Sequence, residues 1–371
     1  MNLCKFILGF LLSRLYLKKN IWLIGERKDQ ARDNGYYLFK YIRKNQPSEN
    51  IYYVIENDAE AKVNVEKFGN VIAFNSLKHY IYFFAAEKLL LPFETSTFPM
   101  SKLIWYLYRL RMIKKKVIFL QHGVTKDNAV HLAYGNRFKF DLVVCASELE
   151  REAFINNLNY PSDKVATLGF PRFDNLLSCA DAKKQIFYMP TWRSWLANVD
   201  EMEFKNSEYY NEIIGLIFDE RIRRYLLSSE NYLILYIHDV LQVKFGHLFT
   251  SDDENIIIAS TKSHDVQKLL QESSLLITDY SSVAFDFVYL NKPVIYYQFD
   301  ESSFFENHFN RGWFDYRDNG FGPVCVNRDQ VVKCILKQDL LAEEYKQRRN
   351  LIFPVRDRLN CKRNYDAIKR T

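Results

Sequence analysis

Closely spaced cysteines are absent from this chain. Any two of its cysteines are at least nine residues apart, so there is no CxxC pair that could bind zinc or carry out thiol–disulfide exchange. We therefore expect free thiols in a reducing cytoplasm. The cysteines are Cys4, Cys145, Cys179, Cys325, Cys334 and Cys361.

A hydrophobic run long enough to span a bilayer is also missing. The run from Phe6 to Leu12 is too short, and no small-residue cleavage site follows it, which argues against a signal peptide. The hydrophobic content of 48% argues against both a disordered chain and a multi-span membrane protein. Residues 1–20 are expected to form either an amphipathic helix at a membrane surface or a helix packed on the protein.

The common nucleotide-binding loops are missing too. There is no GxxxxGK[ST] and no GxGxxG sequence, which argues against an ATPase and a dehydrogenase. The net charge of +6 is mild for a DNA- or RNA-binding protein, and no nucleic-acid motif is present, so no nucleic-acid partner is expected. The charge fits anionic lipids or anionic substrates equally well.

What the chain does contain is a series of short apolar segments that alternate with helical ones. This alternation predicts an α/β protein with parallel sheets. A polar stretch from about Leu177 to Lys184 indicates a boundary between domains at 21–180 and 181–350, with a helix or tail at 351–371. The predicted strands are 21–25, 51–55, 71–74, 88–91, 117–120, 141–145, one that begins at 186 within the segment 186–193, 233–237, 256–259, 275–278 and 293–297.

The segment from Leu275 to Phe287 combines a strand, a polar turn and a helix. Thr278 ends the strand, and the side chains of Asp279, Ser281 and Ser282 can cap the helix that follows. A helix that begins at the carboxyl end of a parallel strand offers amide donors to a phosphate. An ordinary capped turn explains the same residues.

Three other predicted strands also end in polar residues. His122-Gly123 follows one strand, Thr191 and Arg193 follow another, and His238 follows a third. An arginine can form a fork of hydrogen bonds with a phosphate, and a histidine can accept a proton from an alcohol. The alternatives are hydrogen-bonded structural histidines and a domain-interface arginine.

Taken in order, these motifs resemble the CDP-glycerol glycerophosphotransferase family, which builds teichoic acids and related capsular polymers. The resemblance covers about residues 115–325, and residues 26–35 resemble a segment often found upstream. It implies a GT-B fold, in which two Rossmann-like domains face each other across a cleft. It also implies transfer of a polyol phosphate from a CDP-linked donor to a hydroxyl, with release of CMP. The motifs are His122-Gly123, 169–172, 190–193, 277–282 and 291–294.

The resemblance also implies roles for single residues. His122 would be the base on the acceptor hydroxyl, and His238 would lie by the donor diphosphate as a second catalytic histidine. Asp279 would orient the donor or hold the turn. The chain departs from the family at Asp239, where proline is usual, and in the loop after Gly123. The implied donor-binding residues are Gly123, Thr191, Arg193, Thr278, Ser281, Ser282 and Glu301.

The resemblance further implies a polyprenyl-diphosphate-linked saccharide as acceptor, at the cytoplasmic face of the membrane. The basic, apolar segment 101–116 predicts a helix that lies on an anionic leaflet, so the first domain would face the membrane and the second would bind the donor. No metal or other cofactor is expected, and a homo-oligomer is left open. A sugar-nucleotide glycosyltransferase and a non-catalytic polyanion-binding protein remain as alternatives.

Overall fold

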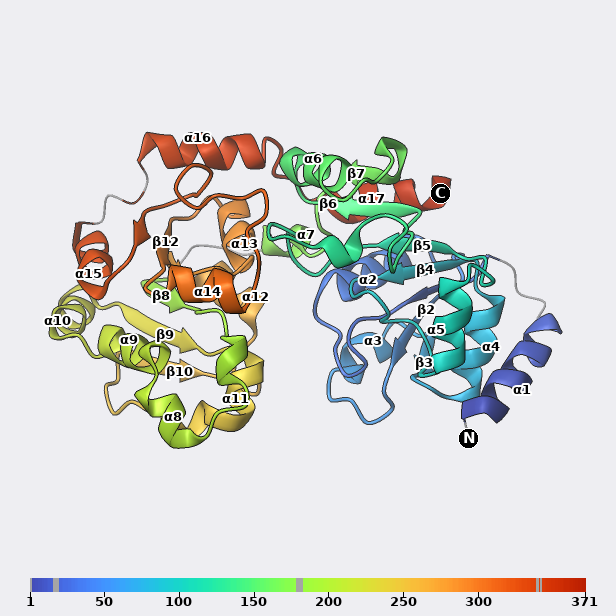
Figure 1. The fold of residues 1–371 in the computed structure, drawn as a ribbon, viewed down its shortest axis with the longest axis horizontal. Helices are drawn as coiled ribbons and strands as arrows, with labels where there is room; N and C mark the ends of the chain where they lie inside the picture. The colour runs from blue at the N-terminus through green and yellow to red at the C-terminus, as the bar shows by residue number, and fades with distance from the viewer. Residues whose placement is uncertain (1, 16–19, 178–182, 338–339, 341) are drawn as a thin grey trace. The chain divides into compact units, whose positions relative to one another are not determined.

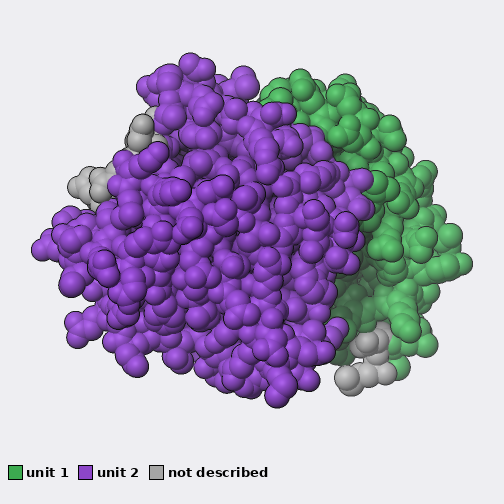
Figure 2. Space-filling model, turned by 60° about the vertical axis from the view of Figure 1, so that its left-hand side comes forward, with its two compact units in different colours: residues 1–125, 129–175, 357–371 green, residues 126–128, 176–356 purple. Residues whose placement is uncertain are grey.

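The computed structural model of the chain describes residues 2–15, 20–177, 183–337, 340 and 342–371. The chain forms two compact units. Unit 1 comprises residues 1–125, 129–175 and 357–371, and unit 2 comprises residues 126–128 and 176–356 (Figure 2). The predicted boundary after residue 180 lies outside the described residues, and the division falls at residue 175.

Unit 1 contains a parallel sheet of seven strands (Figure 1). Each strand is short and mostly apolar, as expected for strands that are covered on both faces. Ile24 pairs with Tyr53 of one neighbouring strand and with Leu90 of the other. The strand order is β3 (Val71–Ala73), β2 (Ile51–Ile55), β1 (Trp22–Ile24), β4 (Lys88–Leu91), β5 (Lys116–Phe119), β6 (Leu142–Cys145) and β7 (Val165–Thr167).

Unit 2 contains a second parallel sheet, of six strands. Tyr188 pairs with Leu235 on one side and with Ile277 on the other, so β8 and β11 lie at its centre. The strand order is β10 (Ile256–Ala259), β9 (Tyr232–Tyr236), β8 (Gln185–Tyr188), β11 (Leu275–Thr278), β12 (Val294–Tyr297) and β13 (Val324–Cys325).

Helices cover both sheets. In unit 1, α1 packs on α4 and α17 packs on α2 (Figure 1). The helices of unit 1 are α1 (Asn2–Arg14), α2 (Asn34–Asn45), α3 (Lys62–Glu66), α4 (Leu77–Ala85), α5 (Lys102–Arg109), α6 (Glu148–Asn156), α7 (Phe173–Leu176, which ends at the boundary) and α17 (Asn360–Arg370). Those of unit 2 are α8 (Glu201–Asn206), α9 (Glu208–Ile217), α10 (Glu220–Ser229), α11 (Asp239–Phe245), α12 (Val266–Glu272), α13 (Val283–Tyr289), α14 (Glu301–Asn307), α15 (Arg328–Lys337) and α16 (Glu343–Ile352).

Side-chain caps fix where several helices begin. Ser147 accepts a hydrogen bond from the Glu150 amide at the start of α6, and Asp265 accepts one from the Lys268 amide at the start of α12. Each cap satisfies an amide that has no partner within its helix.

Two predicted segments differ from the structure. The helix predicted over 101–116 ends at Arg109, because Arg111 adopts a left-handed backbone (φ 59°) and Lys116 begins β5. The predicted C-terminal segment 351–371 is divided, since Ile352 ends α16 in unit 2 whereas α17 belongs to unit 1. Asp174 holds the start of α17 by accepting hydrogen bonds from the Asn360 and Cys361 amides.

Candidate functional site

In each sheet the chain reverses its direction of strand addition at one place. That place is between β1 and β4 in unit 1, and between β8 and β11 in unit 2. Ligands of open α/β sheets bind outside the carboxyl ends of the strands at such switch points. The candidate site of unit 1 is formed by the residues that follow β1, β4 and the neighbouring β5. The candidate site of unit 2 is formed by the residues that follow β8 and β11.

The loop after β5 in unit 1 carries His122 and is held by hydrogen bonds at Gln121. Gln121 has a left-handed backbone (φ 57°), its carbonyl accepts a hydrogen bond from Asn34 (2.6 Å), and its side chain donates to the Val144 carbonyl (2.7 Å). Gly123, one of the predicted donor-binding residues, is buried in this loop. These contacts fix the backbone that presents His122.

Glu150 of α6 supports the same loop. Its two carboxylate oxygens accept hydrogen bonds from the Thr125 amide and the Ala146 amide, each at 2.7 Å. Burial raises the pKa of Glu150 to about 7, against the opposing effect of these two amides. Glu150 lies 28 residues from His122 in sequence and has no motif around it, so the sequence did not indicate its role.

His122 is exposed and has a fixed ring orientation. Its ring stacks on Phe93, with centroids 4.5 Å apart and planes 15° from parallel, and donates a hydrogen bond to the Pro92 carbonyl. Although the side chain reaches solvent, the surrounding protein displaces much of the water around the ring, and this desolvation, followed by the charges of Arg172 and Arg27, lowers the pKa of His122 to about 4. The imidazole is therefore neutral at pH 7, with one nitrogen free of its proton and able to act as a base.

The segment after β1 is anchored by a second buried carboxyl group. Glu26 accepts hydrogen bonds from the amides of Arg32 (2.8 Å), Asp33 (2.9 Å) and Tyr36 (2.7 Å). Burial, together with the charge of Asp33, raises the pKa of Glu26 to about 7. This anchor fixes the backbone on either side of the exposed Arg27.

In unit 2, the side chain of Arg193 is enclosed by two carboxylates. Its side chain is fully buried, and it binds Asp300 through two nitrogens (2.6 and 2.9 Å) and Asp279 through a third (2.9 Å). The predicted contact between Arg193 and donor phosphate therefore has no accessible guanidinium to make it. Arg193 instead ties together the loops that follow β8, β11 and β12.

Asp279 and Thr278 are likewise part of this framework. Asp279 is 1% exposed and accepts hydrogen bonds from the Thr191 amide (2.8 Å) and the Tyr280 amide (2.6 Å), so it holds the turn. The Thr278 hydroxyl donates to the Met189 carbonyl (2.7 Å). Of the two roles that the sequence left open for Asp279, the structure favours the structural one.

Ser281 and Ser282 remain partly exposed at the start of α13. The Ser281 hydroxyl accepts a long hydrogen bond from the Val283 amide (3.3 Å), whereas Ser282 makes no side-chain cap. Glu301, also predicted to bind the donor, begins α14 and forms ion pairs with Arg311 (2.8 Å) and Arg317 (3.2 Å). The predicted serine pair is thus the accessible part of this turn.

Two histidines of unit 2 flank Trp192. The predicted His238 stacks near its ring (centroids 6.1 Å apart), and the unpredicted His308 meets it edge to face (4.8 Å). The Nδ1 of each accepts an amide hydrogen bond, from Val240 (3.3 Å) for His238 and from Ser194 (3.0 Å) for His308. In the neutral form of each ring the proton is therefore on Nε2, and the unprotonated Nδ1 is already engaged by an amide. His308 ends a helix and follows no strand, so the sequence did not single it out.

Within the described ranges, no group of three or more His, Cys, Asp or Glu side chains could hold a metal ion. The expectation that no cofactor is needed stays a prediction.

A family profile described as CDP-Glycerol:Poly(glycerophosphate) glycerophosphotransferase matches residues 8–370. The minor teichoic acid biosynthesis protein GgaB of Bacillus subtilis (strain 168) is 29% identical over 370 residues, which cover 95% of this chain and 40% of that protein. The teichoic acid glycerol-phosphate transferase of Staphylococcus aureus (strain NCTC 8325 / PS 47) is 24% identical over 272 residues, 69% of this chain and 64% of that protein. The chain therefore spans less than two thirds of either relative.

Solved structures confirm the predicted fold class. A structure of the wall teichoic acid polymerase TagF matches 97% of this chain, and 92% of its own, with a TM-score of 0.69 and 18% identity. The UDP-GlcNAc 2-epimerase from Neisseria meningitidis matches 95% of this chain and 100% of its own with a TM-score of 0.58 and 12% identity. Together with the two parallel sheets, these likenesses identify a GT-B fold.

Proposed function

Because the chain belongs to the CDP-glycerol:poly(glycerophosphate) glycerophosphotransferase family, we propose that it transfers glycerol phosphate from CDP-glycerol to a hydroxyl group. The acceptor is a lipid-linked saccharide or a growing teichoic-acid-like or capsular polymer, and CMP is released. The observation that carries this proposal is His122, an exposed and neutral imidazole whose ring is oriented by Phe93 and Pro92.

The proposed reaction is a displacement at the phosphorus that carries the glycerol. The acceptor oxygen forms a bond to this phosphorus while its proton passes to the free nitrogen of His122. The bond from phosphorus to the bridging oxygen breaks, and that oxygen leaves with CMP. The products are a phosphodiester, CMP and a protonated His122, which returns its proton to solvent.

Donor binding is assigned to the accessible groups of unit 2. Ser281 and Ser282 offer hydroxyls beside the start of α13, and His238 lies half-buried after β9. Hydrogen-bond donors of this kind stabilise the charge that develops on a departing phosphate. Arg193 and Asp279 contribute indirectly, because their ion pair holds the turn that presents the serines.

Unit 1 carries a surface that fits an anionic membrane. None of the described helices is long and apolar enough to cross a bilayer. Helices α1 and α5 nevertheless expose apolar side chains, and four cations on or near α5 are exposed as well. We define this α1–α5 surface by Leu3, Ile7, Leu8, Phe10, Leu11, Leu12, Met100, Leu103, Tyr106, Leu110 and Met112 with Lys102, Arg109, Arg111 and Lys114.

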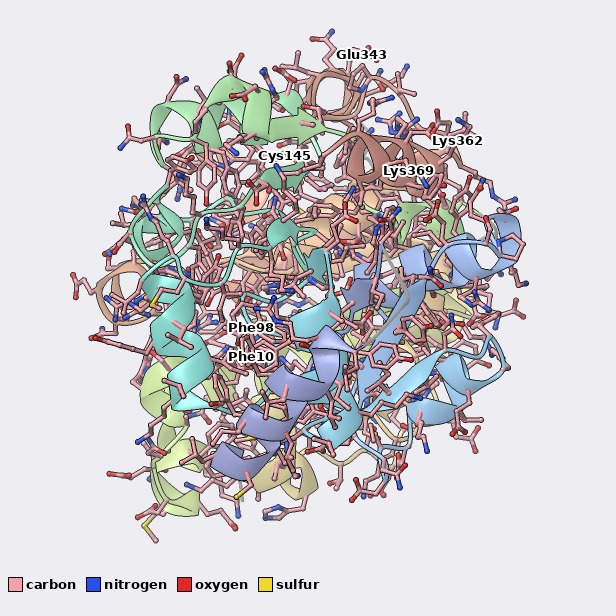
Figure 3. The ribbon with its side chains drawn as sticks, turned by 90° about the vertical axis from the view of Figure 1, so that its right-hand side faces the viewer. Phe10, Phe98, Cys145, Glu343, Lys362 and Lys369 are labelled. Carbon is pink, nitrogen blue, oxygen red and sulfur yellow. The ribbon has the colours of Figure 1, made fainter. Side chains whose placement is uncertain are left out.

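Figure 3 shows α1 at the front of unit 1, with Phe10 labelled. Phe10 and Phe6 both pack edge to face on Phe84 of α4, so α1 is attached to the unit and still exposes much of its apolar side. An apolar helix face flanked by cations binds anionic lipid through both burial and charge. We place the protein peripherally at the cytoplasmic face of the membrane, where a polyprenyl-diphosphate-linked acceptor would be found.

The test of the proposed reaction is the nucleotide released. The full chain is incubated with a lipid-linked acceptor and one donor at a time. The donors are CDP-glycerol, CDP-ribitol, UDP-sugars and GDP-sugars. CMP release together with an acceptor that gains one glycerol phosphate in mass supports the proposal. Release of UDP or GDP would identify a sugar-nucleotide glycosyltransferase, and a folded protein without turnover on any donor would identify a binding protein.

A further inference from the structure

Arg27 is an exposed cation beside the base of unit 1. Its guanidinium lies over the ring of Phe93, 5.0 Å from the centroid, and the same ring stacks on His122 at 4.5 Å. The guanidinium and the imidazole are therefore no further apart than the sum of these two distances. Among the described residues, the Arg27 side chain makes no hydrogen bond or ion pair, and Phe93 is the ring that it lies over.

The position of Arg27 in the fold is that of a ligand-binding residue. It follows β1, Phe93 follows β4 and His122 follows β5, and these three strands are neighbours in the sheet. The switch point of unit 1 lies between β1 and β4. Ligands bind at such points, so Arg27 and Phe93 flank the expected ligand position.

The backbone at Arg27 is fixed before any ligand binds. Glu26 anchors the segment through three amide hydrogen bonds, and the Arg27 carbonyl accepts a hydrogen bond from the Gln30 amide (2.8 Å). Phe93 supports the guanidinium by a cation–π contact. A planar guanidinium held in this way presents parallel N–H donors that match a phosphate.

The other charges near His122 are already paired. Arg172 binds Asp33 (3.0 Å), and Glu94 lies 3.0 Å from His131. Arg27 is thus the cation of this group that is available to a ligand.

We propose that Arg27 is a specificity-determining residue of unit 1 that binds the phosphodiester next to the terminal glycerol of a polyol-phosphate acceptor. This inference rests on the proposed transfer reaction. A terminal glycerol with its hydroxyl at His122 places its own phosphodiester one glycerol away. With hydrogen bonds of about 3 Å at each end, one polyol-phosphate unit spans the separation of His122 and Arg27.

The test uses two soluble acceptors, one with a charged linkage to its terminal glycerol and one with an uncharged linkage. One is a methyl disaccharide that bears a glycerol phosphodiester, and the other bears the same glycerol through an uncharged ether. Transfer from CDP-glycerol and equilibrium binding of each acceptor are measured for the full chain, for Arg27→Gln and for Lys28→Gln. Lys28 is the matched control, because it is adjacent and of equal charge but already paired with Glu56 (2.9 Å).

The wild type is expected to bind and use the charged acceptor in preference to the ether. Arg27→Gln should raise the KM and Kd for the charged acceptor by about tenfold or more, as expected for one charge-assisted phosphate contact. It should leave the ether acceptor and the affinity for CDP unchanged, and Lys28→Gln should resemble the wild type.

Three results would overturn this inference. They are equal use of both acceptors by the wild type, an equal effect of Arg27→Gln on both acceptors, and a loss of CDP affinity in Arg27→Gln, which would assign Arg27 to the donor. The equilibrium binding of the charged acceptor tests this inference independently of the proposed reaction. Arg27-dependent binding of the charged acceptor without transfer would retain the subsite and reject the reaction.

Discussion

At the scale of single residues, Arg193 shows that a predicted ligand contact can be a structural ion pair. Its guanidinium neutralises two carboxylates, Asp279 and Asp300, that are 1% and 7% exposed. Removing one partner of a buried ion pair leaves the other charges unpaired in a medium that solvates them poorly.

We therefore expect Arg193→Ala to lower the free energy of unfolding by about 3–5 kcal/mol, measured by urea denaturation. Arg221→Ala is the control, since Arg221 also pairs with two carboxylates, Asp219 and Asp329, but is largely exposed. It should change stability little. An Arg193→Ala protein of normal stability that has lost CDP affinity would instead restore the predicted donor contact.

Glu150 provides a second prediction at this scale. In Glu150→Gln one of the two carboxylate oxygens is replaced by an NH2 group. The backbone N–H that faces it, of Thr125 or Ala146, is then left without an acceptor. An unpaired buried donor costs about 1–3 kcal/mol, and the loop that carries His122 loses part of its support. We expect transfer to fall by about tenfold with CDP affinity unchanged. The control Glu148→Gln removes an exposed carboxylate from the same helix, and an equal fall in both variants would argue against the positioning role.

His79 predicts how stability depends on pH. Its Nδ1 accepts a hydrogen bond from the Asn75 amide and its Nε2 donates to the Thr97 carbonyl, and burial lowers its pKa to about 4. Between pH 6.5 and about 4 the unfolded chain binds a proton at this histidine and the folded chain does not, so acidification in this range destabilises the fold. Glu26 and Glu150 act in the opposite direction, because their pKa values are raised to about 7.

The contribution of His79 is isolated by comparing the wild type with His79→Gln. The stability advantage of the wild type should shrink as the pH falls from 7 to 4.5, by about 1.4 kcal/mol per pH unit at most. Urea denaturation at several pH values measures it. An advantage that is the same at every pH would mean that His79 is not held neutral.

At the scale of elements, the sequence predicted the central strands well. The strands at 51–55, 88–91 and 275–278 match β2, β4 and β11 residue for residue, because buried parallel strands are continuous apolar runs. Helices α8 to α10, between Glu201 and Ser229, were not predicted, and neither was the short β7. The helix over 101–116 was predicted too long, because its basic end forms the left-handed turn at Arg111 and the first residue of β5.

The site was predictable only in part, for a physical reason. The strand-end position of His122 is visible in sequence, since the carboxyl edge of a parallel sheet collects polar residues. The residues that bind and support the site residues are not visible in the sequence. Asp300 is 107 residues from Arg193, and Glu150 is 25 residues from the Thr125 amide it binds. Such pairings depend on the tertiary fold, and no local pattern encodes them.

The α1–α5 surface gives a prediction for an element. Lys115 does not belong to it, because its ammonium group donates to the Phe84 and Ala86 carbonyls at the end of α4. We expect that changing Leu103, Tyr106, Leu110 and Met112 to serine reduces sedimentation with anionic liposomes by about tenfold or more, since each buried apolar side chain contributes free energy. Neutralising Lys102, Arg109, Arg111 and Lys114 should also reduce it, and more so at low salt.

The matched control changes exposed apolar residues of unit 2, Met202, Leu227 and Val243, to serine. Liposome binding should persist in this variant. Equal losses in the unit 1 and unit 2 variants, or no loss in either, would reject the α1–α5 surface as the site of membrane attachment.

At the scale of the whole molecule, the chain forms two α/β units, each built on a parallel sheet. In the proposed reaction, unit 1 presents His122 as the base, and unit 2 presents the serine turn on a framework of buried ion pairs. The prediction that the two face each other across a cleft stays a prediction. The chain matches 40% of the length of GgaB. The proposed reaction therefore concerns the region that the two proteins share, and not every activity of the longer relative.

The most direct test of the central claim measures transfer and donor binding together in His122→Ala. With CDP-glycerol and a hydroxyl-bearing acceptor, the wild type should release one CMP for each glycerol phosphate added. In His122→Ala, transfer should fall by about 10²–10⁴-fold while CDP affinity is retained, and the exposed control His247→Ala should remain active. Transfer by His122→Ala at the wild-type rate would contradict the account.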